Sequence, residues 1–215
     1  MFNSPHPNEI AKYFQTRDPL MADYMCNSAQ RRVVPNEKVS LFQAIAKSII
    51  SQQLSVKAAT SIFEKLVITF GESGVIAAET IRDTSIQDLR NCGLSRAKVS
   101  TLLSTANKIV DKKIPPQEDM ELMSDSNIVD ALTEVKGIGP WTAEMILIFK
   151  LGRPDVMPAT DLGIQNGYAR IFGLQTKPLP RMIIERSQLW QPYRSTAALY
   201  CWQAVDDTTW TLPGA

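Results

Sequence analysis

Apolar side chains recur at intervals of three and four residues along nearly the whole chain, and no sustained alternation of apolar and polar residues interrupts this pattern. Such spacing places apolar groups on one face of an α-helix, whereas a half-buried strand needs a period of two. Serines at capping positions and glycines at helix ends punctuate the pattern. The sequence therefore predicts an all-α fold.

The expected helices are separated by short turns, and most begin after a residue that can cap their amides. Candidate caps are Ser40, Thr84, Ser95 and either Ser124 or Ser126. The helices are expected over residues 41–50, 56–70, 86–91 and 96–110, then in a short segment ending at 136, and over 141–150, 162–172 and 193–205. The segment after residue 206 is expected to be peripheral.

A chain of 215 residues is long enough for one sizeable core or for two small lobes. The run Lys112-Lys113-Ile114-Pro115-Pro116 stops a helix and is the expected crossing between lobes. We therefore expect one functional unit over residues 1–215, made of two helical lobes. A central lobe covers residues 36–114, and a second lobe covers 1–35 plus 115–215 and carries the hairpin described below.

Composition excludes several kinds of chemistry. The only histidine is His6, so catalytic triads, Cys-His nucleophiles and histidine-based zinc sites lack their imidazole. Cys26, Cys92 and Cys201 lie far apart and are expected to be buried thiols in a reducing compartment. No apolar stretch approaches the ~18 residues of a membrane span, and the first residues lack a signal-peptide pattern. We expect an intracellular protein of the cytoplasm or nucleoid, or of the nucleus in a eukaryote.

The segment Lys136-Gly137-Ile138-Gly139-Pro140 is expected to join two short helices as a helix-hairpin-helix. Glycine lets a backbone approach a partner closely, and proline suits the first position of the second helix. Amides at the start of that helix attract anions, so those of Ile138 and Gly139 could hold DNA phosphates without reading a base. A simple packing turn between two core helices is the alternative.

Longer strings around this hairpin resemble a known family. LTEVKGIGPWTAEMILIF is followed by GRPDVMPATDLGI, with IISQQLS upstream and PYRSTAALYCW downstream. These four motifs resemble the helix-hairpin-helix DNA glycosylase superfamily and, within it, the DNA-3-methyladenine glycosylase II branch. The resemblance implies two helical lobes with a DNA- and base-binding cleft between them, and excision of flipped, alkylated purines in base excision repair.

Asp161 matches the catalytic aspartate of that family and lies 22 positions beyond Gly139. Cleavage of an N-glycosidic bond builds positive charge on the sugar, which a fixed carboxylate stabilises. Asp161 and Thr160 also suit the N-cap of the following helix, and a capping role is compatible with catalysis. Asp155 is the rival acid, but its place before a proline turn favours a solvated or turn residue.

Trp141 stands where the lyase members of the superfamily keep a lysine. An indole cannot form the imine that lyase chemistry needs, so the resemblance implies an N-glycosyl hydrolase with no abasic-site lyase activity. The ring also suits an extruded cationic purine, through a cation–π attraction of about 0.5 to 2 kcal/mol. Trp202 matches a second aromatic of the base pocket, with core packing as the alternative for both rings. Trp190 and Trp210 carry no motif.

The resemblance places the residue that fills the vacated base stack in SQQLS. Gln53 is the first candidate, with Gln52 and Leu54 as alternatives. An exposed turn in which Leu54 anchors the core is the other interpretation. The expected DNA-binding residues are Gln53, Leu54, Gly137, Ile138, Gly139 and Thr142.

Arg194 matches a family position that implies a phosphate contact or support of Asp161, with structural pairing as the alternative. The carbonyl oxygens of Thr133, Val135 and Gly137 resemble those that hold K⁺ or Na⁺ in related hairpins. Such an ion would do no chemistry, so no cofactor is expected to be required. The iron–sulphur cluster of some members needs four closely spaced cysteines, which the sequence lacks.

The resulting hypothesis is a monofunctional DNA glycosylase, working as a monomer on double-stranded DNA that contains 3-methyladenine or 7-methylguanine, and away from membranes. Two alternatives stay open: a binder of abasic or distorted DNA on the same fold, and an unrelated helical scaffold. The preferred lesion is open too, with ethenoadenine and hypoxanthine among the candidates. A formal charge of +1, from 23 basic and 22 acidic residues, predicts few phosphate contacts.

Overall fold

Helices account for the regular structure of the protein, as the sequence predicts. The computed structural model describes residues 6–213, and within that range the only β-type pairing is an isolated bridge between Glu72 and Val75. The chain divides into two compact units. Unit 1 comprises residues 1–35 and 152–215, and unit 2 comprises residues 36–151.

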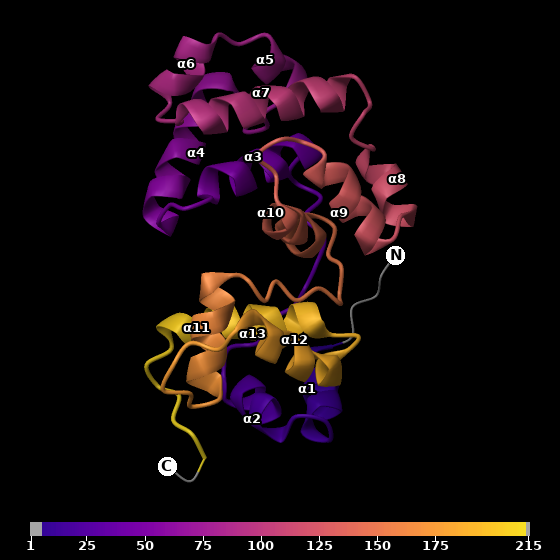
Figure 1. Ribbon diagram of the computed structural model, residues 1–215, viewed down its shortest axis with the longest axis vertical. Helices are drawn as coiled ribbons and strands as arrows, with labels where there is room; N and C mark the ends of the chain where they lie inside the picture. The colour runs from indigo at the N-terminus through magenta and orange to yellow at the C-terminus, as the bar shows by residue number, and fades with distance from the viewer. Residues whose placement is uncertain (1–5, 214–215) are drawn as a thin grey trace. The chain divides into compact units, whose positions relative to one another are not determined.

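Unit 2 is a helical assembly in which five helices begin after a capping serine. Ser40, Ser55, Ser85, Ser95 and Ser124 each accept a hydrogen bond from the amide three residues on. The helices are α3 (Leu41–Ser51), α4 (Val56–Phe70), α5 (Ala78–Arg82), α6 (Ile86–Asn91), α7 (Arg96–Val110), α8 (Gln117–Leu122), α9 (Asp125–Thr133) and α10 (Pro140–Met145), followed by the π-helix η1 (Ile146–Lys150). Helix α7 runs alongside α5 and contacts α3 (Figure 1).

The boundary between the units corrects the expected lobes. Residues 115–151, expected in the second lobe, belong to unit 2 together with residues 36–114. The reason is tertiary packing, because residues beyond the proline run 112–116 contact the central helices. Helices α10 and η1 contact α3, and a Cβ atom added at Gly137 would lie 2.2 Å from Thr101 Oγ1 on α7. The hairpin is therefore built against the central helices.

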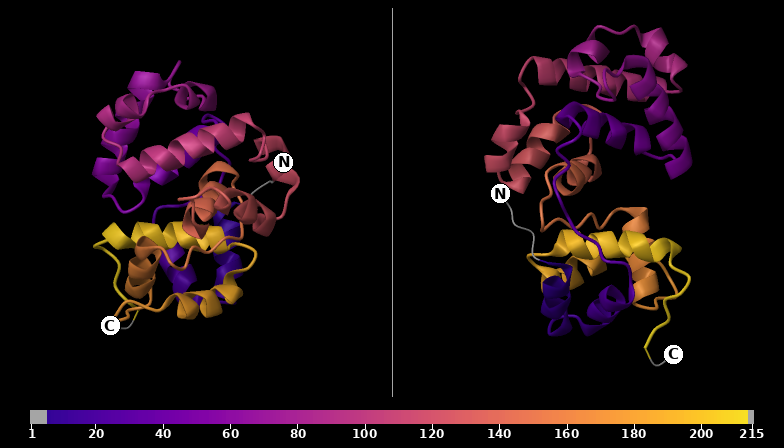
Figure 2. Two further views of the ribbon diagram at one scale, coloured as in Figure 1. Left: turned by 45° about the horizontal axis from the view of Figure 1, so that its top comes forward. Right: turned by 180° about the vertical axis from the view of Figure 1, so that it is seen from behind.

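Unit 1 brings the two ends of the chain into one core. Its helices are α1 (Pro7–Gln15), α2 (Pro19–Asn27), α11 (Leu162–Ile171), α12 (Pro180–Ser187) and α13 (Arg194–Asp206), with the 3₁₀ turn η2 (Gln188–Trp190). Both views of Figure 2 show the orange α11 against the yellow α13. Trp190 is fully buried and donates its indole N–H to the buried carboxylate of Asp18 at 2.8 Å, while Arg186 pairs with the same carboxylate.

Three smaller expectations are corrected. Ser85 rather than Thr84 caps α6, because the cap directly precedes the first helical residue and the helix begins at Ile86, as expected. Cys26 is exposed, whereas Cys92 and Cys201 are buried as expected. The segment after residue 206 is packed rather than peripheral, because the ring of Trp210 lies 5.0 Å from that of Tyr24, centroid to centroid.

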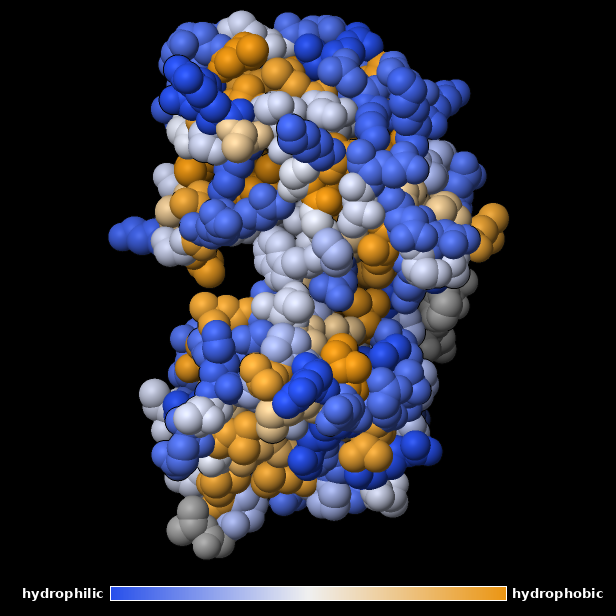
Figure 3. Space-filling view, viewed as in Figure 1, coloured by the Kyte–Doolittle hydropathy of each residue, from blue (hydrophilic) through white to orange (hydrophobic). Residues whose placement is uncertain are grey.

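Hydrophilic side chains cover most of the face shown in Figure 3, and apolar groups occur among them. Within the described residues, no helix combines the length and apolar character needed to cross a bilayer.

Candidate functional site

The carboxylate of Asp161 is held at the start of α11 in unit 1. Its Oδ1 atom accepts the backbone N–H of Ile164 at 2.8 Å, which makes Asp161 the N-cap of that helix. The same oxygen accepts the indole N–H of Trp202 at 2.8 Å. Both donors fix the plane of the carboxylate, so Asp161 is a capping residue and an oriented acid at the same time.

A pair of glycines brings Trp202 to this carboxylate. Gly163 and Gly167 lie four residues apart and therefore share one face of α11. A Cβ atom at Gly163 would lie 2.8 Å from Trp202 Cδ1, and one at Gly167 would lie 1.7 Å from the carbonyl oxygen of Cys201. Any larger residue would push α13 away from α11. These glycines were not among the predicted site residues, although their spacing of four places them on one helix face.

Trp202 makes a contact with Asp161 that the resemblance did not imply. Its ring is half-buried, packs against the core of unit 1, and donates to Asp161. The ring therefore supports the carboxylate, and its place in a base pocket stays a prediction.

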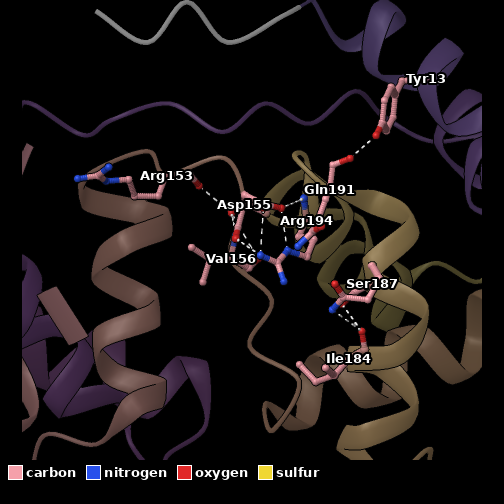
Figure 4. A network of polar contacts seen from close by, with 10 residues as sticks. Tyr13, Arg153, Asp155, Val156, Ile184, Ser187, Gln191 and Arg194 are labelled. Atoms are coloured by element: carbon pink, nitrogen blue, oxygen red, sulfur yellow. Dashed lines mark hydrogen bonds and ion pairs between the residues drawn. The ribbon is translucent and has the colours of Figure 1, made fainter. Parts of the chain in front are cut away.

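Arg194 and Asp155 form a second polar centre in unit 1, shown in Figure 4. The Arg194 guanidinium donates to Asp155 Oδ1 at 2.7 Å and Oδ2 at 3.0 Å, and also to the Asp155 carbonyl. Ser195, which is buried, donates to the carbonyl of Arg153 at 2.7 Å and accepts the amide of Val156 at 2.9 Å. These bonds tie the segment before Asp161 to the start of α13. The structural-pairing interpretation of Arg194 matches this geometry, and Asp155 is ion-paired rather than a solvated turn acid.

The hairpin of unit 2 joins α9 to α10, and its two glycines serve different purposes. Gly137 has φ +95° and lies against Thr101, so it is required by conformation and by close packing. A Cβ at Gly139 would meet nothing within 4 Å. Open space at Gly139, directly before the first turn of α10, is where a partner's backbone could approach.

Two of the expected DNA-binding residues, Ile138 and Thr142, face the interior of the hairpin. The amide of Ile138 donates to the carbonyl of Val135 at 2.9 Å, so it closes the turn, and the Ile138 side chain is buried. The Thr142 side chain is buried as well, and its hydroxyl accepts the carboxamide of Gln52 at 2.9 Å. Both residues therefore stabilise the conformation of the hairpin through buried contacts. The sequence pattern could not separate a contact residue from a residue that shapes the loop.

A pocket of about 430 Å³ opens beside Trp141 within unit 2. Its walls come from α3, α4, α10 and η1, where a π-helical turn breaks the regular α-helical ladder. The apolar part of the lining is formed by Phe63, Trp141, Met145, Ile146 and Phe149. The size is within the range of small-molecule sites, and the aromatic side chains offer surfaces for a flat ring.

Two polar side chains that line this pocket, Gln43 and Lys150, bind other parts of the protein. Gln43 donates to the carbonyl of Gly74 and accepts the amide of Ile76. The Lys150 ammonium donates to the carbonyls of Asn36 and Val39, at 2.7 Å each, and its burial lowers the pKa of this group. The polar groups of Gln43 and Lys150 are therefore engaged within the protein, whereas Lys47 and Ser48 also line the pocket.

The turn SQQLS lies at the end of α3 in the same unit. Gln53 and Leu54 are exposed, and Gln53 has φ +56°. Leu54 is 40% exposed, so it is no core anchor. Gln52 is turned inward toward the hairpin. The geometry leaves Gln53 and Leu54 as the side chains that an approaching partner would meet.

Comparison with known proteins gives the chain its family. The family model described as "HhH-GPD superfamily base excision DNA repair protein" matches residues 46–192. A DNA-3-methyladenine glycosylase 1 of Schizosaccharomyces pombe is 37% identical over 82% of this chain and 78% of its own length. A putative DNA-3-methyladenine glycosylase of Bacillus subtilis, YfjP, is 36% identical over 78% of this chain and 60% of its own length.

A solved structure agrees with these sequence matches. The Schizosaccharomyces pombe 3-methyladenine DNA glycosylase Mag1, in complex with abasic DNA, superposes with a TM-score of 0.83 and 31% identity. The match covers 94% of this chain and 99% of that chain. The family match spans most of the chain and includes the hairpin, Trp141 and Asp161. The chain belongs to the HhH-GPD superfamily of base excision DNA repair proteins.

Proposed function

We propose that the chain is a monofunctional DNA glycosylase that removes alkylated purines from double-stranded DNA. The relatives named as DNA-3-methyladenine glycosylases support the lesion class. One observation of this chain carries the proposal: the Asp161 carboxylate is held by two hydrogen bonds, from the Ile164 amide and the Trp202 indole. Two donors orient this acid more firmly than an N-cap alone requires.

The proposed chemistry is hydrolysis through a cationic sugar. The C1′–N bond breaks, its electron pair leaves with the purine, and a water oxygen adds to C1′ while its proton passes to solvent or to a carboxylate. Asp161 stabilises the positive charge that develops on the sugar. At about 4 Å and an effective dielectric of about 20, opposite charges attract by roughly 4 kcal/mol. If this attraction acts only in the transition state, it raises the rate by about three decades.

Trp141 is proposed to give the extruded base a stacking face in the pocket of unit 2. N3- or N7-alkylation makes the purine cationic and a good leaving group, so the pocket needs no general acid for it. Trp141 has no amine with which to form an imine at C1′. The products are therefore a free base and an intact abasic strand, which makes the enzyme a DNA-3-methyladenine glycosylase II without lyase activity.

The hairpin is proposed to anchor the DNA backbone at the open side of Gly139. A monovalent cation fits the donor set beside it. Carbonyl oxygens suit K⁺ or Na⁺, and although Val135 O accepts the Ile138 amide and Gly137 O accepts the Gln52 carboxamide, each keeps a second lone pair. Thr133, Val135 and Gly137 would hold the ion, which would offset phosphate charge and take no part in bond cleavage.

The test is release of free base from duplexes carrying 7-methylguanine, 3-methyladenine, ethenoadenine or hypoxanthine, measured by chromatography. The expected products are free alkylpurine and a strand that breaks only after alkali treatment, with no borohydride-trapped covalent complex. Tight binding to an abasic analogue without release of any base would support the non-catalytic binder instead. Strand cleavage without alkali would contradict the monofunctional assignment.

A further inference from the structure

We propose that Gln52 and Lys98 are positioning residues that lock the turn Ser51–Ser55, called the wedge turn below, to the hairpin of residues 134–139. Locked in this way, the turn presents Gln53 to a duplex whose backbone the hairpin holds. The inference rests on the proposed function, because it assumes that the hairpin contacts DNA.

Gln52 connects the two elements directly. Its Nε2 atom donates to the carbonyl of Gly137 at 3.1 Å and to the Thr142 hydroxyl at 2.9 Å. Gly137 belongs to the hairpin loop, and Thr142 lies in the first turn of α10. One carboxamide therefore joins the wedge turn to both sides of the bend in the hairpin. A side chain that only solvated an exposed turn would not reach across 85 and 90 positions of sequence to make these bonds.

Lys98 also holds the wedge turn, through its backbone. It lies near the start of α7, and its ammonium donates to the carbonyls of Ile50 and Gln52 at 2.5 and 2.9 Å. A cation at the C-terminal end of α3 also suits the negative end of that helix. Burial lowers the pKa of Lys98, because removal from water disfavours the charged ammonium. Its bonds to the two carbonyls offset part of this desolvation.

The lock constrains the backbone at Gln53. Gln52 has φ −55° and ψ 126°, Gln53 has φ +56°, and the amide of Leu54 points to the carbonyl of Ser51 at 3.4 Å. This is a type II turn, whose third position favours glycine because φ is positive there. The chain instead places an exposed glutamine in that position, with a side chain that contributes nothing to the turn. Strain of this kind is characteristic of residues kept for function.

The lock fixes the distance between the wedge turn and the hairpin, the two elements proposed to contact DNA. When the hairpin holds a phosphate, the position of the wedge turn relative to the duplex is fixed. Gln53 then enters the duplex without a separate ordering step. Loss of the lock should therefore leave phosphate binding intact and slow the extrusion of the base.

Three measurements test this on the full chain. Anisotropy with a tetrahydrofuran abasic-site duplex gives the dissociation constant, 2-aminopurine beside the lesion reports extrusion, and single-turnover base release gives the chemical rate. For Gln52→Ala and Lys98→Met we expect extrusion and single-turnover rates to fall roughly 10- to 100-fold, with affinity changed less than about 3-fold. Lys98→Arg should recover most of the rate.

Matched controls separate positioning from general stability. Lys65→Met removes an ammonium-to-carbonyl bond of the same kind, to Asn91, and Gln87→Ala removes an exposed carboxamide of the same unit. Both controls should keep the wild-type extrusion rate. Gln53→Gly should raise the melting temperature, because glycine relieves the positive φ, while slowing extrusion.

The proposal is overturned if folded Gln52→Ala and Lys98→Met extrude at the wild-type rate, or if the controls slow extrusion equally. It is also overturned if the loss lies wholly in affinity. Because 2-aminopurine fluorescence needs no bond cleavage, a wild-type protein that extrudes bases without releasing any would refute the proposed function while still testing the lock.

Discussion

Asp161 and Trp202 show how one residue can satisfy local structure and chemistry together. The carboxylate caps α11, and the same oxygen receives an indole N–H from α13. Neither bond depends on DNA, so the acid is oriented before substrate arrives. Such preorganisation spares reorganisation during the reaction, which is why a fixed carboxylate is worth more than a mobile one.

Trp202→Phe tests this orientation. Phenylalanine keeps an aromatic ring against Gly163 but removes the N–H that Asp161 Oδ1 accepts. We expect the single-turnover rate to fall about 10-fold, as for loss of a hydrogen bond to a charged group, with unchanged affinity for abasic-site DNA. Trp210→Phe is the control, because it removes an indole N–H bond to the Ile171 carbonyl in the same unit. Equal losses in the two variants would contradict the role given to Trp202.

At the scale of elements, the hairpin depends on two glycines that sequence alone treats alike. The spacing GxG predicts a tight reversal, and the structure bears that out. Only the structure shows that Gly137 packs on Thr101 whereas Gly139 faces open space. Their substitutions should therefore separate folding from binding.

Gly137→Ala and Gly139→Ala form a matched pair. At Gly137 the positive φ and the contact with Thr101 should cost about 1–3 kcal/mol of stability, a fall of several degrees in melting temperature. At Gly139 the methyl group has room in the protein, so the melting temperature should hold while affinity for duplex DNA weakens severalfold. Calorimetry and anisotropy measure the two effects. If Gly139→Ala binds DNA normally, the hairpin is not the proposed anchor.

The long amphipathic helices were predictable from the sequence. For α3, α4 and α7, apolar spacing, a serine cap and a terminal break all agree, and their bounds lie within a residue or so of the prediction. The short helices of the terminal regions were not predicted. Helix α1 is capped by His6, an unusual capping residue, and α12 starts at Pro180 with no side-chain cap.

Candidate site residues were predictable where a sequence motif identifies them. Contacts that depend on tertiary packing were not predictable. Asp161 and the hairpin follow from strings of adjacent residues. The bond from Trp202 to Asp161 depends on how closely α13 approaches α11, and the bonds of Gln52 depend on contacts 85 and 90 positions away. The π-helical turn at 146–150 and the unit boundary after 151 likewise arise from tertiary packing, which periodicity does not encode.

For the molecule as a whole, the near balance of charge bears on DNA binding. A net charge of +1 gives the protein little overall electrostatic attraction for a polyanion such as DNA. We expect log affinity to fall with log salt at a slope corresponding to about 2 to 5 released counterions. Titrations of an abasic-site duplex between low and moderate salt measure the slope. A value typical of about 8 to 10 contacts would contradict this expectation.

Stability at high pH should depend on unit 1, where several tyrosines are buried. Burial raises the pKa of Tyr24 from 10.0 to about 12, with the Asp207 carboxylate adding to the effect, and burial also raises the pKa of Tyr168 and Tyr200. These phenols must stay protonated in the folded state. Their contribution to stability is therefore present below about pH 10 and is lost as the pH rises toward 12.

Tyr24→Phe should make denaturant unfolding less sensitive to pH above 10, because one of these titrations is removed while the ring stays in the core. Urea midpoints measured at neutral pH and between pH 10 and 12 give the comparison. A pH dependence as steep as that of the wild type would show that Tyr24 is not among the groups responsible.

The most direct test of the central claim is single-turnover release of 7-methylguanine by Asp161→Asn. Asparagine is as good an N-cap as aspartate, so the variant should fold with an unchanged melting temperature and bind abasic-site DNA. It lacks the negative charge, and we expect its rate of base release to fall by about three decades. Release at the wild-type rate by the folded variant would show that Asp161 is a helix cap and that the catalytic carboxylate lies elsewhere.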